Sequence, residues 1–133
     1  MADPYAGAVI AVVDDDPGIL KSLEYLLESA DYAVHLFGSA AAFFESGCLT
    51  TIDCLVSDID MPAIDGIDLL RAVHDNRPAL AVVLITGHPE MPDRLRAVGV
   101  GYHALFRKPF DGPALLTAVR DAVRTTRSPP RLA

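Results

Sequence analysis

Residues 8–16 read Ala-Val-Ile-Ala-Val-Val-Asp-Asp-Asp, a continuous apolar run that ends abruptly in three carboxylates. Such a run is typical of a strand buried on both faces, as in the middle of a parallel sheet. Four further apolar runs follow along the chain, at 32–37, 52–56, 80–85 and 103–106. The sequence therefore predicts five strands.

The segments between these runs have the spacing of amphipathic helices. One apolar stripe is formed by Ile19, Leu20, Leu23, Leu26, Leu27 and Ala30, and another by Leu115, Leu116, Val119 and Val123. Helix starts are indicated by capping residues before or beside proline or small residues. These starts are Asp16 before Pro17, Ser39 before a helix over 40–46 that ends at Gly47, and Asp111 or Gly112 before Pro113.

Strand and helix alternate five times, which predicts an α/β protein with a doubly wound (βα)5 arrangement. We expect a flavodoxin-like three-layer sandwich around a five-stranded parallel sheet in the order 2-1-3-4-5. The expected organisation is an N-terminal tail over 1–7, one domain over 8–124, and a polar C-terminal tail or truncated linker over 125–133.

Composition excludes several classes of protein. No apolar run approaches the roughly 20 residues of a membrane span, and the first residues lack the basic flank of a signal peptide. The formal net charge of −7 argues against direct nucleic-acid contact by this segment. Cys48 and Cys54 have no histidine cluster near them and do not indicate a zinc site or a disulfide framework. We therefore expect a cytoplasmic protein without a membrane segment.

Polar residues fall where the predicted strands end. Asp14 and Asp15 follow the first strand, Asp58 the third, Thr86 the fourth and Lys108 the fifth. The carboxyl ends of parallel strands share one edge of the sheet, so these side chains are expected to converge there. Clustered carboxylates repel one another by roughly 4 kcal/mol per pair at 4 Å and a dielectric constant of 20. This predicts a bound hard cation, with Mg²⁺ the best match to oxygen ligands.

A carboxylate held beside a metal and a lysine is well placed to attack a phosphoryl group and form an acyl phosphate. In that chemistry Lys108 would offset the charge of the phosphoryl oxygens, and Thr86 would donate its hydroxyl to one of them. Gly87 leaves the approach to the site open. The candidate acceptor is Asp58.

Four segments in this order resemble the receiver domain of two-component response regulators, a CheY-like superfamily. They are VVDDD at 12–16, SDIDMPAIDG at 57–66, VLITGH at 83–88 and FRKPF at 106–110, and the similarity covers about residues 8–124. The third and fourth segments are most similar to receivers of the nitrogen-fixation regulator type.

The resemblance implies roles for individual residues. Asp58 would be the phosphoacceptor, with Asp15 binding Mg²⁺ directly, Asp14 through water and Asp60 through its backbone carbonyl. Thr86 would be the switch hydroxyl, and Lys108 the phosphate partner with a cis bond to Pro109. By position alone, His88 and Asp60, each two residues beyond a site residue, are candidates either to flank the entrance to the site or to be plain surface residues.

The resemblance also implies partners. A phosphohistidine on a sensor histidine kinase would be the phosphoryl donor, and an output domain or effector protein would receive the signal, with transcription as the expected output. A phosphorylation-linked homodimer is a further expectation. One position departs from the family: Leu105 stands where receivers usually carry the Tyr or Phe that moves with the switch threonine.

Two other functions remain open at this stage. Asp58 and Asp60 have the spacing found in phosphohydrolases that use an aspartyl phosphate, although those enzymes carry the pair after their first strand. A receiver-like interaction module that works without phosphorylation is the other alternative. The complete set of site residues argues against it, while Leu105 leaves it open. A dinucleotide-binding domain is disfavoured because residues 11–19 contain no glycine-rich phosphate loop.

Overall fold

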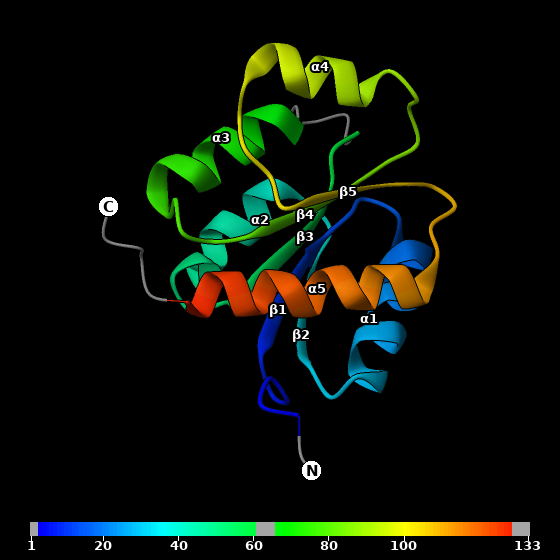
Figure 1. Cartoon of the computed structure of the whole chain (residues 1–133), viewed down its shortest axis with the longest axis vertical. Helices are drawn as coiled ribbons and strands as arrows, with labels where there is room; N and C mark the ends of the chain where they lie inside the picture. The colour runs from blue at the N-terminus through cyan, green and yellow to red at the C-terminus, as the bar shows by residue number, and fades with distance from the viewer. Residues whose placement is uncertain (1–2, 61–65, 129–133) are drawn as a thin grey trace.

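The computed structural model describes residues 3–60 and 66–128 (Figure 1). Residues 61–65 of the SDIDMPAIDG segment, and residues 129–133 of the predicted tail, lie outside these ranges. Strands and helices alternate along the chain as the sequence predicts. They are β1 (Val9–Val13), α1 (Pro17–Ser29), β2 (Ala33–Phe37), α2 (Ala40–Ser46), a 3-10 turn (Cys48–Thr50), β3 (Cys54–Asp58), α3 (Gly66–Asn76), β4 (Val82–Thr86), α4 (Met91–Val98), β5 (Ala104–Arg107) and α5 (Gly112–Arg127).

The five strands form one parallel sheet in the order β2-β1-β3-β4-β5. This confirms the predicted doubly wound (βα)5 fold and its strand order. In the register, Val13 lies beside Ser57, Asp58 beside Ile85, and Thr86 beside Arg107. The ends of β1, β3, β4 and β5 are therefore level with one another along a single edge.

Helices cover both faces of the sheet and make three layers (Figure 1). On one face, β1 contributes Ala11 and Val13 to a core shared with α2, α3 and α4. On the other face, Ile10 and Val12 pack against α1 and α5. This alternation follows from the two-residue period of a strand, which sends successive side chains to opposite faces.

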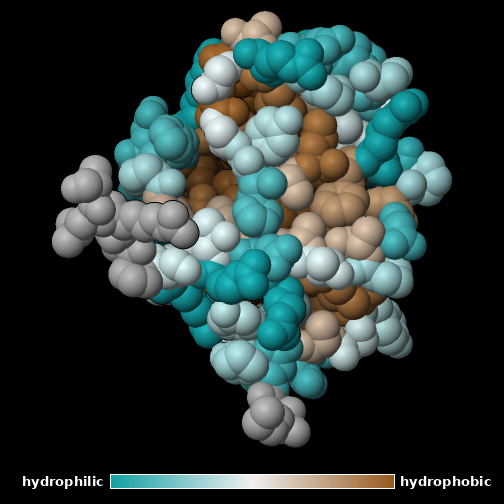
Figure 2. Space-filling view, viewed as in Figure 1, coloured by the Kyte–Doolittle hydropathy of each residue, from teal (hydrophilic) through white to brown (hydrophobic). Residues whose placement is uncertain are grey.

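The two edge strands are less buried than the three central ones. β1, β3 and β4 are almost wholly buried, whereas β2 is exposed or half-buried along its length. β5 is half-buried as far as Phe106. Hydrophobic surface remains visible in the region between α4 and α5 (Figure 2). A continuous apolar run therefore predicts a strand buried on both faces correctly for β1, β3 and β4, but not for β2.

Strand boundaries differ slightly from the apolar runs. β3 begins at Cys54 and β4 at Val82, each two residues later than the corresponding run. Both strands also continue into the polar residues that follow the runs, so that Ser57, Asp58 and Thr86 belong to the sheet. The backbone ladder, and not hydrophobicity, decides where each strand ends.

The predicted helix caps are present. Asp16 accepts a hydrogen bond from the Gly18 amide with Pro17 at the first helical position, and Ser39 accepts one from the Ala42 amide. Asp111 caps α5 by accepting from the Ala114 amide. These side chains satisfy amides that the first turn of a helix leaves without partners.

The last helix continues beyond the point predicted from sequence. We expected a polar tail from Thr125, but α5 extends to Arg127. Two long-range contacts account for this: the Thr126 hydroxyl accepts a hydrogen bond from the Ala81 amide, and Arg127 binds both carboxylate oxygens of Asp53. The domain limits themselves remain a prediction.

Gly66 begins α3 directly against the backbone of Ile59. A Cβ atom built at Gly66 would overlap both the carbonyl oxygen and the Cα atom of Ile59. Every other residue type is therefore excluded unless α3 moves away. The contact fixes the start of α3 against the residue that follows Asp58.

The helices are short and amphipathic. Each places its apolar side chains against the sheet and its polar ones outward, as the two core clusters show. Within residues 3–60 and 66–128, no helix combines the length and the apolar character needed to cross a membrane.

We expect the pair formed by Asp53 and Arg127 to stabilise the fold in a pH-dependent way. Burial alone would raise the pKa of Asp53, but the hydrogen bonds from Arg127 and from the Val9 amide outweigh it and lower this pKa. A carboxyl group whose pKa is lower in the folded chain stabilises the fold above its unfolded pKa, about 3.9. That contribution is lost as the pH falls through the folded pKa.

Asp53→Asn should therefore lower the free energy of unfolding by about 1–2 kcal/mol near neutral pH. The difference from the unsubstituted protein should shrink as the pH falls below about 4. Urea unfolding at several pH values measures both effects. Asp121→Asn is the matched control, because Asp121 pairs with Arg124 in an exposed setting worth about 0–1 kcal/mol. Equal, pH-independent losses in the two variants would contradict the assignment.

Candidate functional site

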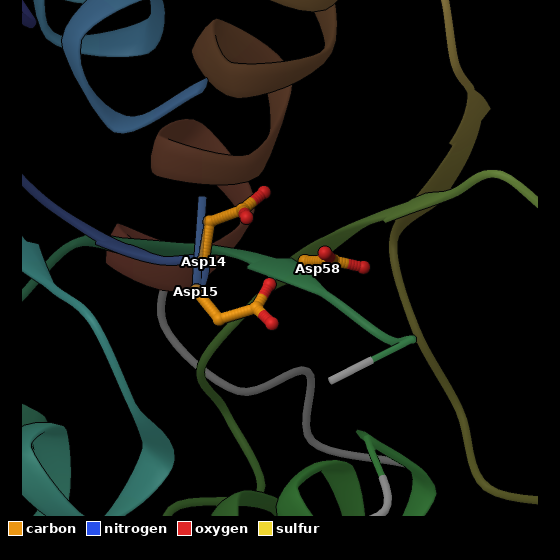
Figure 3. Close-up of side chains that lie close together, drawn as sticks. All are labelled: Asp14, Asp15 and Asp58. Carbon is orange, nitrogen blue, oxygen red and sulfur yellow. The ribbon is translucent and has the colours of Figure 1, made fainter. Parts of the chain in front are cut away.

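Three carboxylates gather at the carboxyl ends of β1 and β3. One oxygen from each of Asp14, Asp15 and Asp58 lies within 4.8 Å of the others. Figure 3 shows the three side chains side by side at the ends of the two adjacent strands. Asp14 and Asp58 are buried, at 1% and 4% exposure, whereas Asp15 is open to solvent. The acidic cluster therefore has a closed inner side and an accessible outer side.

Lys108 reaches this acidic cluster from the loop after β5. Its Nζ atom lies 3.1 Å from Oδ2 of Asp58 and 3.5 Å from Oδ2 of Asp14. The Lys108 amide donates to the carbonyl of Thr86 at 2.8 Å, which ties the loop to the end of β4. The peptide bond between Lys108 and Pro109 is cis, as the resemblance implied. The lysine side chain is 28% exposed and the Asp58 side chain 5%, so water reaches the pair only from the lysine side.

The pKa values of the two groups follow from this arrangement. Burial and the charge of Asp58 raise the pKa of Asp14, although the Asp16 amide and Lys108 oppose the rise. Burial alone would lower the pKa of Lys108, but its hydrogen bond to Asp58 and the charges of Asp58 and Asp14 outweigh burial and raise it. Lys108 is therefore held as a cation, and the site disfavours the charged form of Asp14.

Both oxygens of Asp58 are held in place. Oδ1 accepts a hydrogen bond from the Asp60 amide at 2.8 Å, and Oδ2 accepts from Lys108. The preceding residue, Ser57, is also buried and bonds the carbonyl of Asp58. A carboxylate fixed in this way at the end of a central strand is pre-oriented for attack on an electrophile.

The donor set fits a hard divalent cation. All three clustered side chains offer carboxylate oxygens, and Lys108 offsets only one of their three charges. Mg²⁺ prefers oxygen ligands and usually takes one or two carboxylates together with water. The family resemblance implies one further oxygen ligand, the backbone carbonyl of Asp60. Residual negative charge at a partly open rim is the physical reason to expect a cation here.

Thr86 and Gly87 lie at the end of β4, next to β3. The Thr86 hydroxyl contacts the carboxylate of Asp60, with distances of 2.9 Å to Oδ1 and 3.1 Å to Oδ2. The Gly87 amide donates to Oδ2 of Asp60 at 2.6 Å. The sequence indicated Asp60 only as a carbonyl ligand and as a residue at the entrance. Its carboxylate contacts were not predicted, because they depend on how the backbone at Asp60 lies against the end of β4.

His88 and Leu105 complete the predicted set. The His88 amide donates to the Thr86 hydroxyl oxygen at 3.0 Å, while its imidazole Nδ1 lies 3.5 Å from Oε1 of Glu90 on the surface. Leu105 pairs with Leu84 in the sheet and packs into the core shared with α2, α3 and α4. Phe106 points to the opposite core. No aromatic ring of β5 thus shares the face of Leu105.

The structure brings most of the predicted residues together. Asp14, Asp15, Asp58 and Lys108 are in direct proximity, and Thr86 is linked to them through Asp60. Gly87 has open space on its side facing the site, where a Cβ would meet only an oxygen of Asp60, at 3.7 Å. The His88 imidazole points away from Thr86 to Glu90, and Leu105 lies beneath the rim as a packing residue.

Comparison with known proteins agrees with this geometry. Residues 10–120 match the family described as the response regulator receiver domain. The transcriptional regulatory protein FixJ of Azorhizobium caulinodans is 39% identical over 111 residues, which is 84% of this chain and 53% of that protein. The C4-dicarboxylate transport transcriptional regulatory protein DctD of Pseudomonas aeruginosa is 36% identical over 118 residues, 89% of this chain and 26% of that protein. The chain thus spans about half the length of FixJ and a quarter of DctD.

Solved structures lead to the same family. Full-length FixJ from B. japonicum superposes with a TM-score of 0.78 at 34% identity, over 90% of this chain and 59% of that one. A response regulator receiver domain protein from Clostridium thermocellum superposes with a TM-score of 0.79 at 31% identity, over 88% of this chain and 94% of that one. Fold, sequence match and the acidic edge of the sheet agree, and the chain belongs to the receiver domain family of two-component response regulators.

Proposed function

We propose that this receiver domain is a phosphorylation-dependent switch that accepts a phosphoryl group on Asp58. The observation that carries the proposal is the state of the Asp58 carboxylate. It is buried, held by an amide at one oxygen and by Lys108 at the other, and placed beside Asp14 and Asp15. A merely structural aspartate would not need two further carboxylates within 4.8 Å.

The transfer is a displacement at phosphorus. An oxygen of Asp58 forms the new P–O bond while the bond from phosphorus to the donor's imidazole nitrogen breaks, and the electron pair leaves with that nitrogen. The donor is a phosphohistidine on a sensor histidine kinase. Lys108, already paired with Asp58, stabilises the negative charge that spreads over the phosphoryl oxygens. The product is an acyl phosphate, and the chain acts as a switch and not as a turnover enzyme.

Mg²⁺ is the proposed cofactor. Asp15 and Asp58 would bind it directly, Asp14 through water, and Asp60 through its backbone carbonyl. When bound, the ion supplies positive charge that offsets the carboxylates and the phosphoryl oxygens. Around it, the protein's own part is to hold Asp58 oriented and to keep Lys108 charged.

Phosphorylation then changes the balance of charge at the rim. The group adds about −1.5 to −2 charges near neutral pH and three strong acceptor oxygens. Thr86 and Lys108 are the donors that respond, and Pro109, Gly87 and His88 shape the loops that carry them. Leu105, directly beneath the rim and packed in the same core as α4, reports the change by repacking where most receivers use an aromatic ring. Couplings of this kind are about 1–3 kcal/mol.

The partners follow from the family. Receiver domains of response regulators work with histidine kinases and output domains, and two of the relatives reported above are transcriptional regulators. We therefore propose that residues 8–124 act in the cytoplasm on an output domain or effector that controls transcription. A phosphorylation-linked homodimer would couple the switch to that output.

Labelling with a small phosphodonor tests the acceptor. We expect the unsubstituted protein, with Mg²⁺ present, to take up an acid-stable, base-labile phosphoryl group, and Asp58→Asn to take up none. Intact-protein mass spectrometry and gel separation of the two forms measure the uptake. Asp16→Asn is the control, because asparagine caps a helix as well as aspartate does and Asp16 is outside the acidic cluster.

Persistent labelling of Asp58→Asn at another residue would contradict the assignment. Release of phosphate from phosphate esters over many turnovers would instead favour the aspartyl-phosphate phosphohydrolase. Absence of labelling in the unsubstituted protein would favour an interaction module that works without phosphorylation.

Metal binding makes a separate prediction. Mg²⁺ should raise the free energy of unfolding of the unsubstituted protein, by about 2.7 kcal/mol at roughly 100 times its Kd. Asp14→Asn should bind Mg²⁺ more weakly, so that its free energy of unfolding rises less when Mg²⁺ is added. Without Mg²⁺ it should be at least as stable as the unsubstituted protein, because the site disfavours the charged form of Asp14. Urea unfolding with and without Mg²⁺, at constant ionic strength, measures these differences.

Asp16→Asn serves as the control for this experiment too, since it removes a neighbouring charge and keeps the helix cap. Mg²⁺ should raise the free energy of unfolding of Asp16→Asn by as much as it raises that of the unsubstituted protein. If Mg²⁺ stabilised Asp14→Asn and Asp15→Asn as strongly as the unsubstituted protein, the ion would have to bind outside the acidic cluster.

A further inference from the structure

The side chain of Asp60 makes contacts that the proposed chemistry does not explain. Its carboxylate lies against two donors at the end of β4, the hydroxyl of Thr86 at 2.9 Å and the amide of Gly87 at 2.6 Å. At the same time its own amide donates to Oδ1 of Asp58. Asp60 thus bridges the acceptor aspartate and the switch threonine. Its backbone amide binds Asp58, and its side-chain carboxylate binds Thr86.

These contacts use the full donor capacity of Thr86. A hydroxyl group has a single proton to donate, and the oxygen can accept further hydrogen bonds. Here that proton is directed at the Asp60 carboxylate, while the Thr86 oxygen accepts from the His88 amide. Thr86 therefore has no second proton to offer to a phosphoryl oxygen as long as it remains bound to Asp60.

We propose that Asp60 is a positioning residue whose carboxylate occupies the Thr86 hydroxyl and the Gly87 amide in the unphosphorylated protein, in competition with the phosphoryl group. The inference rests on the proposed phosphorylation of Asp58. It assigns to the Asp60 side chain a role separate from that of its backbone carbonyl. The carboxylate is an internal anion that holds the donors until a stronger anion displaces it.

Charge makes the competition one-sided after phosphorylation. The phosphoryl group on Asp58 and the carboxylate of Asp60 are both negative, and like charges at short range repel. Rotation of the Asp60 side chain alone is enough to break these contacts, because its carboxylate makes both of them. Its release frees both donors together, since the same carboxylate holds both.

Three variants separate the contributions. Asp60→Ala removes the acceptor and the charge, and Asp60→Asn keeps one acceptor oxygen but removes the charge. Glu90→Ala is the matched control, because Glu90 is an exposed acid on the same side of the molecule that faces His88 and does not contact Thr86. Thermal unfolding of each variant establishes that it is folded.

The first measurement needs no phosphodonor and no metal. Amide hydrogen exchange and the NMR chemical shift of the Gly87 amide report directly on its hydrogen bond. We expect Asp60→Ala to lose protection at Gly87 by about tenfold, since a hydrogen bond to a charged group is removed. Asp60→Asn should lose less, and Glu90→Ala should match the unsubstituted protein.

The second measurement uses beryllofluoride, a trigonal anion that binds carboxylates as a mimic of a phosphoryl group, with Mg²⁺ present. We expect Asp60→Ala to bind it about tenfold more tightly than the unsubstituted protein, because the competing anion is gone. Asp60→Asn should lie between the two, and Glu90→Ala should change the Kd by less than about twofold.

The outcomes distinguish this inference from the proposed function. If the unsubstituted protein binds beryllofluoride but Asp60→Ala binds it equally or more weakly, the competition is overturned and the proposed function stands. Unchanged protection of the Gly87 amide in Asp60→Ala would likewise overturn the inference. If the unsubstituted protein neither binds beryllofluoride nor is labelled, the proposed function fails and the competition fails with it.

Discussion

The ion pair between Lys108 and the buried carboxylates of Asp58 and Asp14 is the interaction on which the site depends. An unpaired buried charge is costly, so two carboxylates at the ends of central strands need a cation close by. Lys108 comes from 50 residues further along the chain than Asp58, and only the parallel register of β3, β4 and β5 brings it there. One lysine offsets only part of the charge of the acidic cluster, and this is the physical basis for the proposed Mg²⁺ site.

Much of the fold and of the acidic cluster was predictable from sequence because their signals are local. Asp16, Ser39 and Asp111 each cap a helix through an amide two or three residues away, and the apolar runs mark the central strands. The extent of α5 was not predictable, since Thr126 and Arg127 are held in the helix by Ala81 and Asp53, 45 and 74 residues distant. The exposure of β2 follows from its place at the edge of the sheet, which an apolar run does not encode.

The contacts of Asp60 show where sequence reasoning ends. The family resemblance implied a backbone ligand at Asp60, and such a role can be carried over from sequence because every residue has a carbonyl. The direction of its carboxylate depends on the backbone after β3 and on two donors at the end of β4. The carboxylates at this edge of the sheet therefore have two different environments. Asp14 and Asp58 lie against Lys108, whereas the Asp60 carboxylate binds the Thr86 hydroxyl and the Gly87 amide at the end of β4.

The close approach of Gly66 to Ile59 has a mechanical consequence. With no room for even a methyl group between them, the start of α3 and the residue after Asp58 are in backbone contact. Movement of Ile59 toward the start of α3 is therefore blocked by backbone atoms, which a change of side-chain rotamer cannot relieve. The missing side chain of Gly66 thus makes the residue after Asp58 and the first turn of α3 a single mechanical unit.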